Sequence, residues 1–334
     1  MRKTMLLALL FLLAPTVRAA KTLDVYFIDV EGGQATLLVS PSGQSLLVDT
    51  GWSDFNGRDA DRIVAAAKMA GVKQIDYLLI THYHEDHVGG VPQLAARIPI
   101  RNFVDHGSSV ESGKRPDELF HAYEAVRAKG NHLLAKPGEK IPIRGIDVTI
   151  LSAAGNVITK PLPGAGAPNP LCAAAKLKDT DPSENARSVG ILIRYGKFRL
   201  INLGDLTWNK EHDLICPDNL VGTVDVYLSS HHGLDQSGSP ALVHALHPRV
   251  AIMNNGATKG GQAGAWQVIH SSPGLEDFWQ LHYAEAGGDE NNSSDPFIAN
   301  RTEHGNWIKL SAESSGEFKV TNSRNGNTRT YPRP

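Results

Sequence analysis

The sequence predicts one α/β domain built from layered sheets. Short strand-like segments lie near both ends of the 334-residue chain, helix-like segments lie between them, and no repeat or clear linker divides the chain. Strands that alternate with helices are typical of sheets covered by helices. With 41% hydrophobic and 20% charged residues the chain can build a core, which excludes a disordered, collagen-like or coiled-coil protein.

Residues 1–19 are predicted to be a secretory signal peptide. Arg2 and Lys3 stand before an apolar run over residues 5–13, and small residues follow at the expected cleavage site. An N-terminal membrane anchor is the alternative, but nine apolar residues fall short of the roughly 20 that span a bilayer. We therefore expect residues 20–334 to form a single exported domain, periplasmic or extracellular, without stable membrane insertion.

The charge balance and the cysteines restrict the partners and the compartment. With 33 basic and 35 acidic residues the formal charge is −2, and loss of the signal peptide makes the chain more acidic. Long nucleic acid, which needs clustered Lys and Arg, is therefore not expected as a partner. An oxidising compartment permits a disulfide between Cys172 and Cys216, and two buried free thiols are the alternative. The sequence does not indicate an oligomeric state.

Gly and Pro residues divide the N-terminal half into short strands and helices. The expected elements are strands over 23–28, 35–39 and 45–48, a helix over 59–70, strands over 74–80 and 100–104, a helix over 117–129 and a strand over 146–151. The first helix places Ile63, Val64 and Ala67 on one face and ends at Gly71. The strand over 74–80 is almost continuously apolar, as expected when both faces are buried.

The C-terminal half adds more strands and two irregular stretches. The expected strands are a hairpin over 188–195 and 198–203, buried strands over 224–229 and 250–254, and terminal hairpins over 307–331. Residues of about 152–186 and 255–303 are expected to be long loop insertions, which in compact domains are usually lids or binding loops. In the second insertion, the spacing of apolar residues over 275–282 predicts a short amphipathic helix.

Candidate chemistry is concentrated in residues 81–90, Thr-His-Tyr-His-Glu-Asp-His-Val-Gly-Gly. His82 and His84 are two apart and can project from the same side of a strand end, while Asp86 and His87 begin the next helix. Three imidazoles and a carboxylate this close would leave lone pairs and charge uncompensated if they were buried without a cation. The run therefore predicts a metal site; an exposed loop with chance histidines does not explain the preceding strand and the trailing glycines.

The pattern His82-X-His84-X-Asp86-His87, with Val48-Asp49-Thr50-Gly51 upstream, resembles the metallo-β-lactamase superfamily. Two later motifs resemble the same family, Leu203-Gly204-Asp205 and Ser229-Ser230-His231-His232-Gly233. The resemblance implies an αββα sandwich with two long loop insertions. It also implies two divalent metals at one edge of the sheets.

The resemblance also implies which side chains hold the metals. It assigns His82 and His84 to the first metal, Asp86, His87 and His231 to the second, and Asp205 to the position between them. These nitrogen and carboxylate ligands suit zinc best, and a carboxylate-bridged pair could also take manganese or iron. Asp49 stands where the family keeps a carboxylate that orients a ligand histidine, and a simple turn residue before Gly51 is the alternative.

The third histidine that normally completes the first metal site is missing, because no histidine occurs between His132 and Asp205. Asn185 stands near its place. This resembles the branch typified by the lactamase-like domain of the bacterial DNA-uptake channel protein ComEC. An amide oxygen is a poorer zinc ligand than imidazole. His106, after the strand expected over 100–104, is the rival candidate for the third ligand.

The predicted function is that of an exported metal-dependent hydrolase. Two divalent ions lower the pKa of a bound water and polarise the bond that is attacked, and Asp86 or Asp205 could guide the proton of that water. The resemblance to the ComEC-like branch implies phosphodiester hydrolysis, and the acidic charge of the chain favours a small phosphodiester or related ester over long nucleic acid. A β-lactamase or lactonase is the alternative, and a metal-stabilised binding module without turnover is the alternative of another class.

Both insertions begin near the expected metal edge and are predicted to form the walls of the substrate cleft. Candidate substrate-binding residues are His232, Lys259, Trp266 and His282. Lys259 could hold an anionic group in an otherwise acidic protein, and aromatic rings offer stacking surface. The alternative is that the insertion packs on the core.

Overall fold

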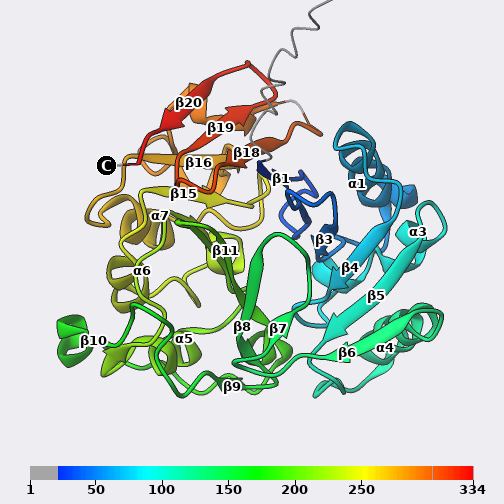
Figure 1. Cartoon of the computed structure of the whole chain (residues 1–334), viewed down its shortest axis with the longest axis horizontal. Helices are drawn as coiled ribbons and strands as arrows, with labels where there is room; N and C mark the ends of the chain where they lie inside the picture. The colour runs from blue at the N-terminus through cyan, green and yellow to red at the C-terminus, as the bar shows by residue number, and fades with distance from the viewer. Residues whose placement is uncertain (1–21, 303, 334) are drawn as a thin grey trace, which may run out of the picture.

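The computed structural model describes residues 22–302 and 304–333, so the predicted signal peptide lies outside the described residues. Two nine-stranded sheets form the centre of the molecule. Helices α1, α3 and α4 lie beside one sheet and α5, α6 and α7 beside the other (Figure 1). The predicted αββα sandwich is confirmed.

The first sheet combines an antiparallel half with a parallel half. In spatial order its strands are β20 (Thr328–Tyr331), β19 (Phe318–Asn322), β18 (Ile308–Ala312), β1 (Leu23–Phe27), β2 (Thr36–Val39), β3 (Ser45–Val48), β4 (Ile75–Leu79), β5 (Ile100–Asp105) and β6 (Asn131–Leu134). The strands from β3 to β6 are parallel. Parallel neighbours need crossover connections, which here contain α1 (Arg58–Met69), α2 (Glu85–Val88), α3 (Val91–Ala95) and α4 (Lys114–Arg127).

The second sheet is also mixed. Its strands are β17 (Ile298–Asn300), β16 (Asp277–His282), β15 (Val250–Met253), β14 (Val226–Leu228), β12 (Phe198–Asn202), β11 (Gly190–Tyr195), β8 (Asp147–Ala153) and β7 (Lys140–Ile141), with β9 (Asn156–Val157) paired to β8. Helices α5 (Trp208–Ile215), α6 (Pro240–Leu246) and α7 (Ala263–His270) connect its parallel strands, and β10 (Ala167–Pro168) pairs with β13 (Asp218–Asn219) in a separate ribbon.

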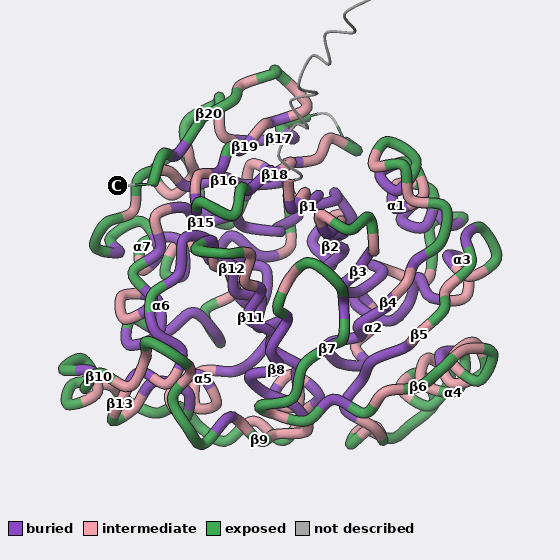
Figure 2. The backbone as a smooth tube through the Cα atoms, in the orientation of Figure 1, coloured by how far each residue is buried: buried purple, intermediate pink, exposed green. Residues whose placement is uncertain are grey.

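The core follows the period of two that strands impose on side chains. In β1, Val25 and Phe27 point into the core between the sheets, whereas Tyr26 packs on the helix side. The second sheet has its own helix-side core, which includes Tyr227 and Phe278. Figure 2 shows buried backbone along both sheets and exposed backbone at the periphery.

The second expected insertion is largely regular structure. Residues 255–303 contain α7, β16 and β17, and the last two continue the sheet in parallel register. The helix predicted over 275–282 is wrong, because Asp277–His282 is strand β16. Trp279 packs between the sheets and Phe278 packs on the helix side. A strand buried on both faces has no polar alternation, so its apolar residues matched a helical spacing by chance.

The first expected insertion is fastened to the helix layer by a disulfide. Cys172 and Cys216 are bonded, with their Cα atoms 5.7 Å apart. Cys172 lies in the 3₁₀ turn η2 (Pro170–Ala174), and Cys216 follows α5. Within the described ranges no helix combines the length and the apolar character needed to cross a membrane.

Candidate metal centre

The histidine-rich run lies where β4 ends and α2 begins. The two glycines after it let α2 pack directly on the chain that leaves β3. A Cβ on Gly90 would collide with the backbone oxygen of Thr50. The Thr50 amide donates to the carbonyl oxygen of His87 at 2.8 Å, and this contact brings the end of β3 beside the start of α2.

Four buried side chains meet at this edge, and we call them the central cluster: Asp86, His87, Asp205 and His232. Each offers one ligand atom, and these four atoms all lie within 4.8 Å of one another. His232 Nε2 lies 3.1 Å from Asp86 Oδ2, 3.2 Å from His87 Nε2 and 3.4 Å from Asp205 Oδ2. Segments after β4, β12 and β14 supply these residues.

Three more histidines adjoin the central cluster. His82 Nε2 lies 3.8 Å from Asp205 Oδ2 and 3.1 Å from His84 Nδ1. His231 Nε2 lies 3.4 Å from the same Asp205 oxygen. The same oxygen of Asp205 therefore faces His82 as well as the histidines of the central cluster.

The donor set fits divalent metal ions. Asp205 Oδ1 is buried and has no hydrogen-bond partner among the described residues, and a buried carboxylate oxygen without a partner is costly. Two ring nitrogens, on His87 and His232, face each other at 3.2 Å. Imidazole nitrogens and carboxylate oxygens that converge in this way are the ligands that zinc takes in proteins.

The buried charges of the cluster shift the pKa values of its members in different directions. Burial alone would raise the pKa of Asp86 and Asp205, but the charge on His87 and hydrogen bonds from His232 hold both pKa values well below the usual range. Burial would lower the pKa of His87, yet Asp205, Asp86 and Asp49 together raise it. Burial lowers the pKa of His82 and His231, so both present neutral rings with a free lone pair.

Two carboxylates fix the orientation of the candidate ligands. Asp49 Oδ2 lies 2.8 Å from His87 Nδ1, and Asp49 also accepts the Thr81 amide and hydroxyl. This leaves His87 Nε2 directed at the central cluster, as expected of a carboxylate that orients a ligand histidine. Glu111 Oε1 lies 3.0 Å from His84 Nε2, which leaves Nδ1 facing His82. The sequence reasoning missed Glu111, which lies in a polar segment with no motif.

The paired histidines after β14 lie differently from the assignment that the resemblance implied. His232, not His231, contacts Asp86 and His87, whereas His231 meets Asp205. Both residues have positive φ, 54° and 55°, in the 3₁₀ turn η4 (Ser230–Gly233). In an extended strand neighbouring side chains point to opposite faces, but this left-handed turn brings both rings to Asp205.

The two candidates for the third ligand of the first metal lie in different surroundings. His106 Nε2 pairs with the buried Glu184 Oε2 at 2.8 Å, and its ring packs on Tyr83. His106 Nε2 is thus engaged with Glu184, which also accepts the amides of Tyr83 and Val110, and the ligand role of His106 stays a prediction. Asn185 Oδ1 is buried and without a hydrogen-bond partner in the described part of the chain, and its role as a ligand stays a prediction.

Of the candidate substrate-binding residues besides His232, only Lys259 reaches the central cluster. Its ammonium group donates to Asp86 Oδ2 and lies 4.7 Å from the centre of the Trp52 ring. Trp266 is on α7 and packs on Phe278 in the helix-side core. His282 is 1% exposed and pairs with Asp29 instead. The cleft role is therefore wrong for Trp266 and His282, because the segment that carries them is part of the sheet and its covering helix.

The comparisons with known proteins agree with this geometry. Residues 28–167 match the family model described as metallo-beta-lactamase superfamily. Recombination protein 2 of Haemophilus influenzae is 25% identical over 75% of this chain and 26% of its own length. ComE operon protein 3 of Bacillus subtilis is 23% identical over 70% of this chain and 28% of its own. A hydroxyacylglutathione hydrolase of Stenotrophomonas maltophilia is 38% identical over 30% of this chain and 37% of its own.

The match to these curated relatives is partial, since the chain spans about a quarter to just over a third of their length. Among solved structures, the metallo-beta-lactamase fold protein YhfI of Bacillus subtilis is 11% identical and covers 85% of this chain and 98% of its own, with a TM-score of 0.46. The similarity to recombination protein 2 and to ComE operon protein 3 is consistent with the resemblance to the ComEC-like branch. Over residues 28–167 the chain is thus similar to the metallo-beta-lactamase superfamily.

Proposed function

We propose that this chain is an exported hydrolase that uses two divalent metals, zinc by its donor set, to cleave a phosphodiester or a related ester of a small molecule. The observation that carries the proposal is the convergence of the central cluster with His82, His84 and His231 around one carboxylate, Asp205. A structural zinc site is closed by four ligands, whereas this arrangement offers more donors than one ion needs.

The chain's own residues would divide into two ligand sets. His82 Nε2 and His84 Nδ1 lie together on one side of Asp205, and Asp86, His87 and His232 lie on the other. Metals bound there supply Lewis acidity and a water of lowered pKa. Asp86 and Asp205 stay ionised because their pKa values are held low, so their oxygens can accept hydrogen bonds from the attacking water and orient it.

An anionic substrate is supported by Lys259. Its ammonium group is held between Asp86 and the face of Trp52, at the rim of the ligand set. If Asp86 served as a metal ligand, the Lys259 ammonium would be available to pair with an anionic substrate. A phosphodiester oxygen would then find a positive charge beside the metals, which favours phosphate over a neutral lactone.

Export is supported by the disulfide between Cys172 and Cys216. Such bonds persist in oxidising compartments and are rare in the cytosol. Export agrees with the signal peptide that the first 19 residues predict. The name of the Stenotrophomonas maltophilia relative, a hydroxyacylglutathione hydrolase, supports hydrolysis as the reaction class.

The proposal is tested by pairing metal analysis with a substrate panel. We would measure bound metal by elemental analysis, and hydrolysis of bis-p-nitrophenyl phosphate, a chromogenic lactam and a set of lactones. We expect phosphodiester cleavage that Asp205→Asn abolishes and that His121→Ala, an exposed histidine on α4, leaves unchanged. Cleavage of the lactam or lactones alone would overturn the substrate class, and a metal-loaded protein that cleaves nothing would indicate a binding module.

A further inference from the structure

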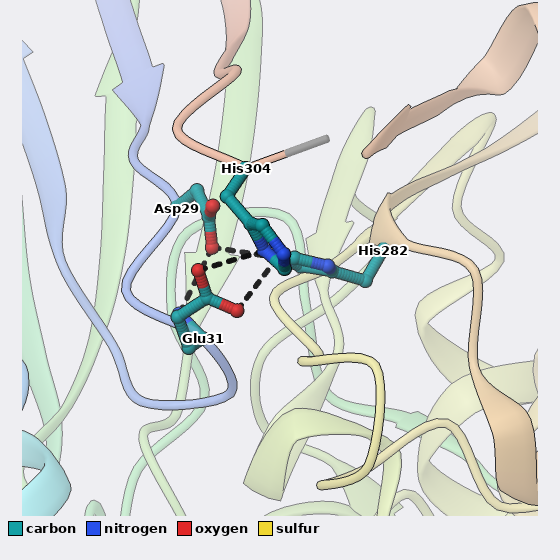
Figure 3. Close-up of side chains that lie close together, drawn as sticks. All are labelled: Asp29, Glu31, His282 and His304. Atoms are coloured by element: carbon teal, nitrogen blue, oxygen red, sulfur yellow. Dashed lines mark hydrogen bonds and ion pairs between the residues drawn. The ribbon is translucent and has the colours of Figure 1, made fainter. Parts of the chain in front are cut away.

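A second group of metal-ligating side chains lies apart from the central cluster, and we call it the outer cluster: Asp29, Glu31, His282 and His304 (Figure 3). One ligand atom from each residue lies within 4.8 Å of those of the others. Three distant segments supply the four residues, namely the loop after β1, the end of β16 and the chain that follows β17. Only the tertiary fold therefore brings the four side chains together.

The donor atoms converge on one point. His282 Nε2 lies 2.7 Å from Asp29 Oδ1 and 3.7 Å from Glu31 Oε2. His304 Nδ1 lies 3.0 Å from Glu31 Oε1. Figure 3 shows both imidazole rings directed at the two carboxylates. Ligands bound to one ion at about 2.0–2.2 Å lie roughly 3–3.5 Å apart, so small side-chain shifts would bring these donors into coordination.

Arg62 accounts for only part of the negative charge of the outer cluster. Its Nη1 lies 3.0 Å from Asp29 Oδ2 and 3.1 Å from Glu31 Oε1. The Gly305 amide also donates to Asp29 Oδ2, at 2.7 Å. On the side of His282 lie Glu31 Oε2 and Asp29 Oδ1, and Asp29 Oδ1 also accepts the Glu31 amide at 2.9 Å. With neutral imidazoles, two carboxylates and one guanidinium sum to one uncompensated negative charge.

Burial divides the outer cluster into an inner part and an open side. Asp29 and His282 are each 1% exposed at the side chain, whereas the His304 side chain is 56% exposed. His282 Nδ1 is buried and lacks a hydrogen-bond partner among residues 22–302 and 304–333. The inner donors are thus closed from water, and His304 stands at the open side where an ion could enter.

We propose that the outer cluster binds one further divalent transition metal ion, separate from the metals of the proposed active centre. Two imidazoles and two carboxylates suit zinc in tetrahedral coordination. The ion would join the loop after β1 to the end of β16 and to the segment after β17. Its role is structural, because all four donors are protein side chains and no position is left for a substrate.

The loop after β1 connects this site to the active centre. The Gln34 amide donates to the carbonyl oxygen of Asp86 at 3.0 Å, and a Cβ added to Gly32 would lie 2.9 Å from Lys259 Cβ. The outer ion therefore fixes the loop on which Asp86 and Lys259 rest. It would act on hydrolysis only through the position of these two residues.

The test counts metal ions with variants of each cluster. Elemental analysis after gel filtration would compare three proteins, each with added Zn²⁺. These are the natural chain, the outer-cluster variant Glu31→Gln/His304→Ala and the central-cluster variant Asp205→Asn/His232→Ala. We expect the outer-cluster variant to lose one equivalent of zinc relative to the natural chain. The central-cluster variant should retain one equivalent, which disappears when both sets of substitutions are combined. His121→Ala serves as the control for an exposed histidine.

Zinc-dependent stability gives a second readout that needs no activity. In the Asp205→Asn/His232→Ala background, Zn²⁺ added to chelator-treated protein should raise the Tm, and the added Glu31→Gln/His304→Ala pair should remove this shift. Equal zinc content in the natural chain and the outer-cluster variant would overturn the proposal, as would a central-cluster variant that binds no zinc. Failure of the hydrolase proposal looks different, because zinc would remain bound at both clusters while no substrate is cleaved.

Discussion

At the scale of single residues, one carboxylate organises the centre. Asp205 Oδ2 lies within 3.8 Å of ring nitrogens from His82, His87, His231 and His232. The ligand run over 82–87 could be predicted from sequence because its members are adjacent and their spacing carries the chemistry. Glu111 and the outer cluster could not, because only tertiary contacts bring those side chains to their partners.

Asp49 provides a residue-scale prediction. Asp49→Asn keeps the shape of the side chain but removes the charge that faces His87 Nδ1. We expect metal affinity to fall by about 10–100-fold, the usual effect of losing such a partner, with little change in fold. Zinc titration against a competing chelator measures this, and Asp54→Asn, an exposed carboxylate nearby, is the control. Equal affinities for the two variants would show that Asp49 is only a turn residue.

Lys259 provides a second residue-scale prediction. Lys259→Ala should raise the KM for bis-p-nitrophenyl phosphate by about tenfold, which corresponds to one charged hydrogen bond of roughly 1.5 kcal/mol. The KM for a neutral ester and the metal content should stay unchanged, and the exposed Lys160→Ala variant should behave like the natural chain. An equal rise in KM for the charged and the neutral substrate would contradict this anion-binding role.

At the scale of elements, the sequence predicts β1 well but not β16. The prediction over 23–28 matches β1 closely, because one face meets the inter-sheet core and the other meets the helices. β16 is apolar on both faces, so its period is hidden. Because the sequence does not reveal α7 and β16 as regular elements, it predicts a cleft position for Trp266 and His282, which belong to these two elements.

A buried carboxyl on helix α5 binds the backbone at the start of α6, and this leads to a pH prediction. Glu211 on α5 is fully buried and accepts the amides of Gly238 and Ser239 at 2.8 and 2.9 Å. Burial raises its pKa to about 7. A carboxyl whose pKa is raised on folding contributes stability below its unfolded pKa, and this contribution is lost as pH rises through about 7.

The natural chain should therefore lose roughly 3 kcal/mol of unfolding free energy from this group between pH 4 and pH 8. Glu211→Gln should remove this dependence of the unfolding free energy on pH. The glutamine side chain should also lower stability at every pH, because its NH₂ group would face one of the two backbone N–H donors. Urea unfolding at several pH values measures both effects. An unchanged pH slope in the variant would show that Glu211 does not titrate in this range.

At the scale of the whole molecule, the αββα sandwich is predicted by the resemblance of the motifs to the metallo-β-lactamase superfamily, whereas the strand and helix patterns alone predict only an α/β domain of layered sheets. The sequence does not decide whether Cys172 and Cys216 form a disulfide, since it cannot show that the two residues meet. The bond joins residues 44 apart, and in the chain-entropy model such a loop stabilises a fold by about 4 kcal/mol. Cys172→Ser/Cys216→Ser should lose a stability of this order in denaturant unfolding. A loss well under 1 kcal/mol would show that other contacts hold η2 on α5.

The central claim is that hydrolysis depends on metals held around Asp205. It is tested most directly by titrating Zn²⁺ into chelator-treated Glu31→Gln/His304→Ala protein, in which the outer cluster is disabled, while the rate of bis-p-nitrophenyl phosphate cleavage is followed. We predict no turnover without metal, a rate that rises to its maximum at about two equivalents of zinc, and no turnover at any zinc level in Asp205→Asn. Full turnover in the metal-free protein would contradict the account.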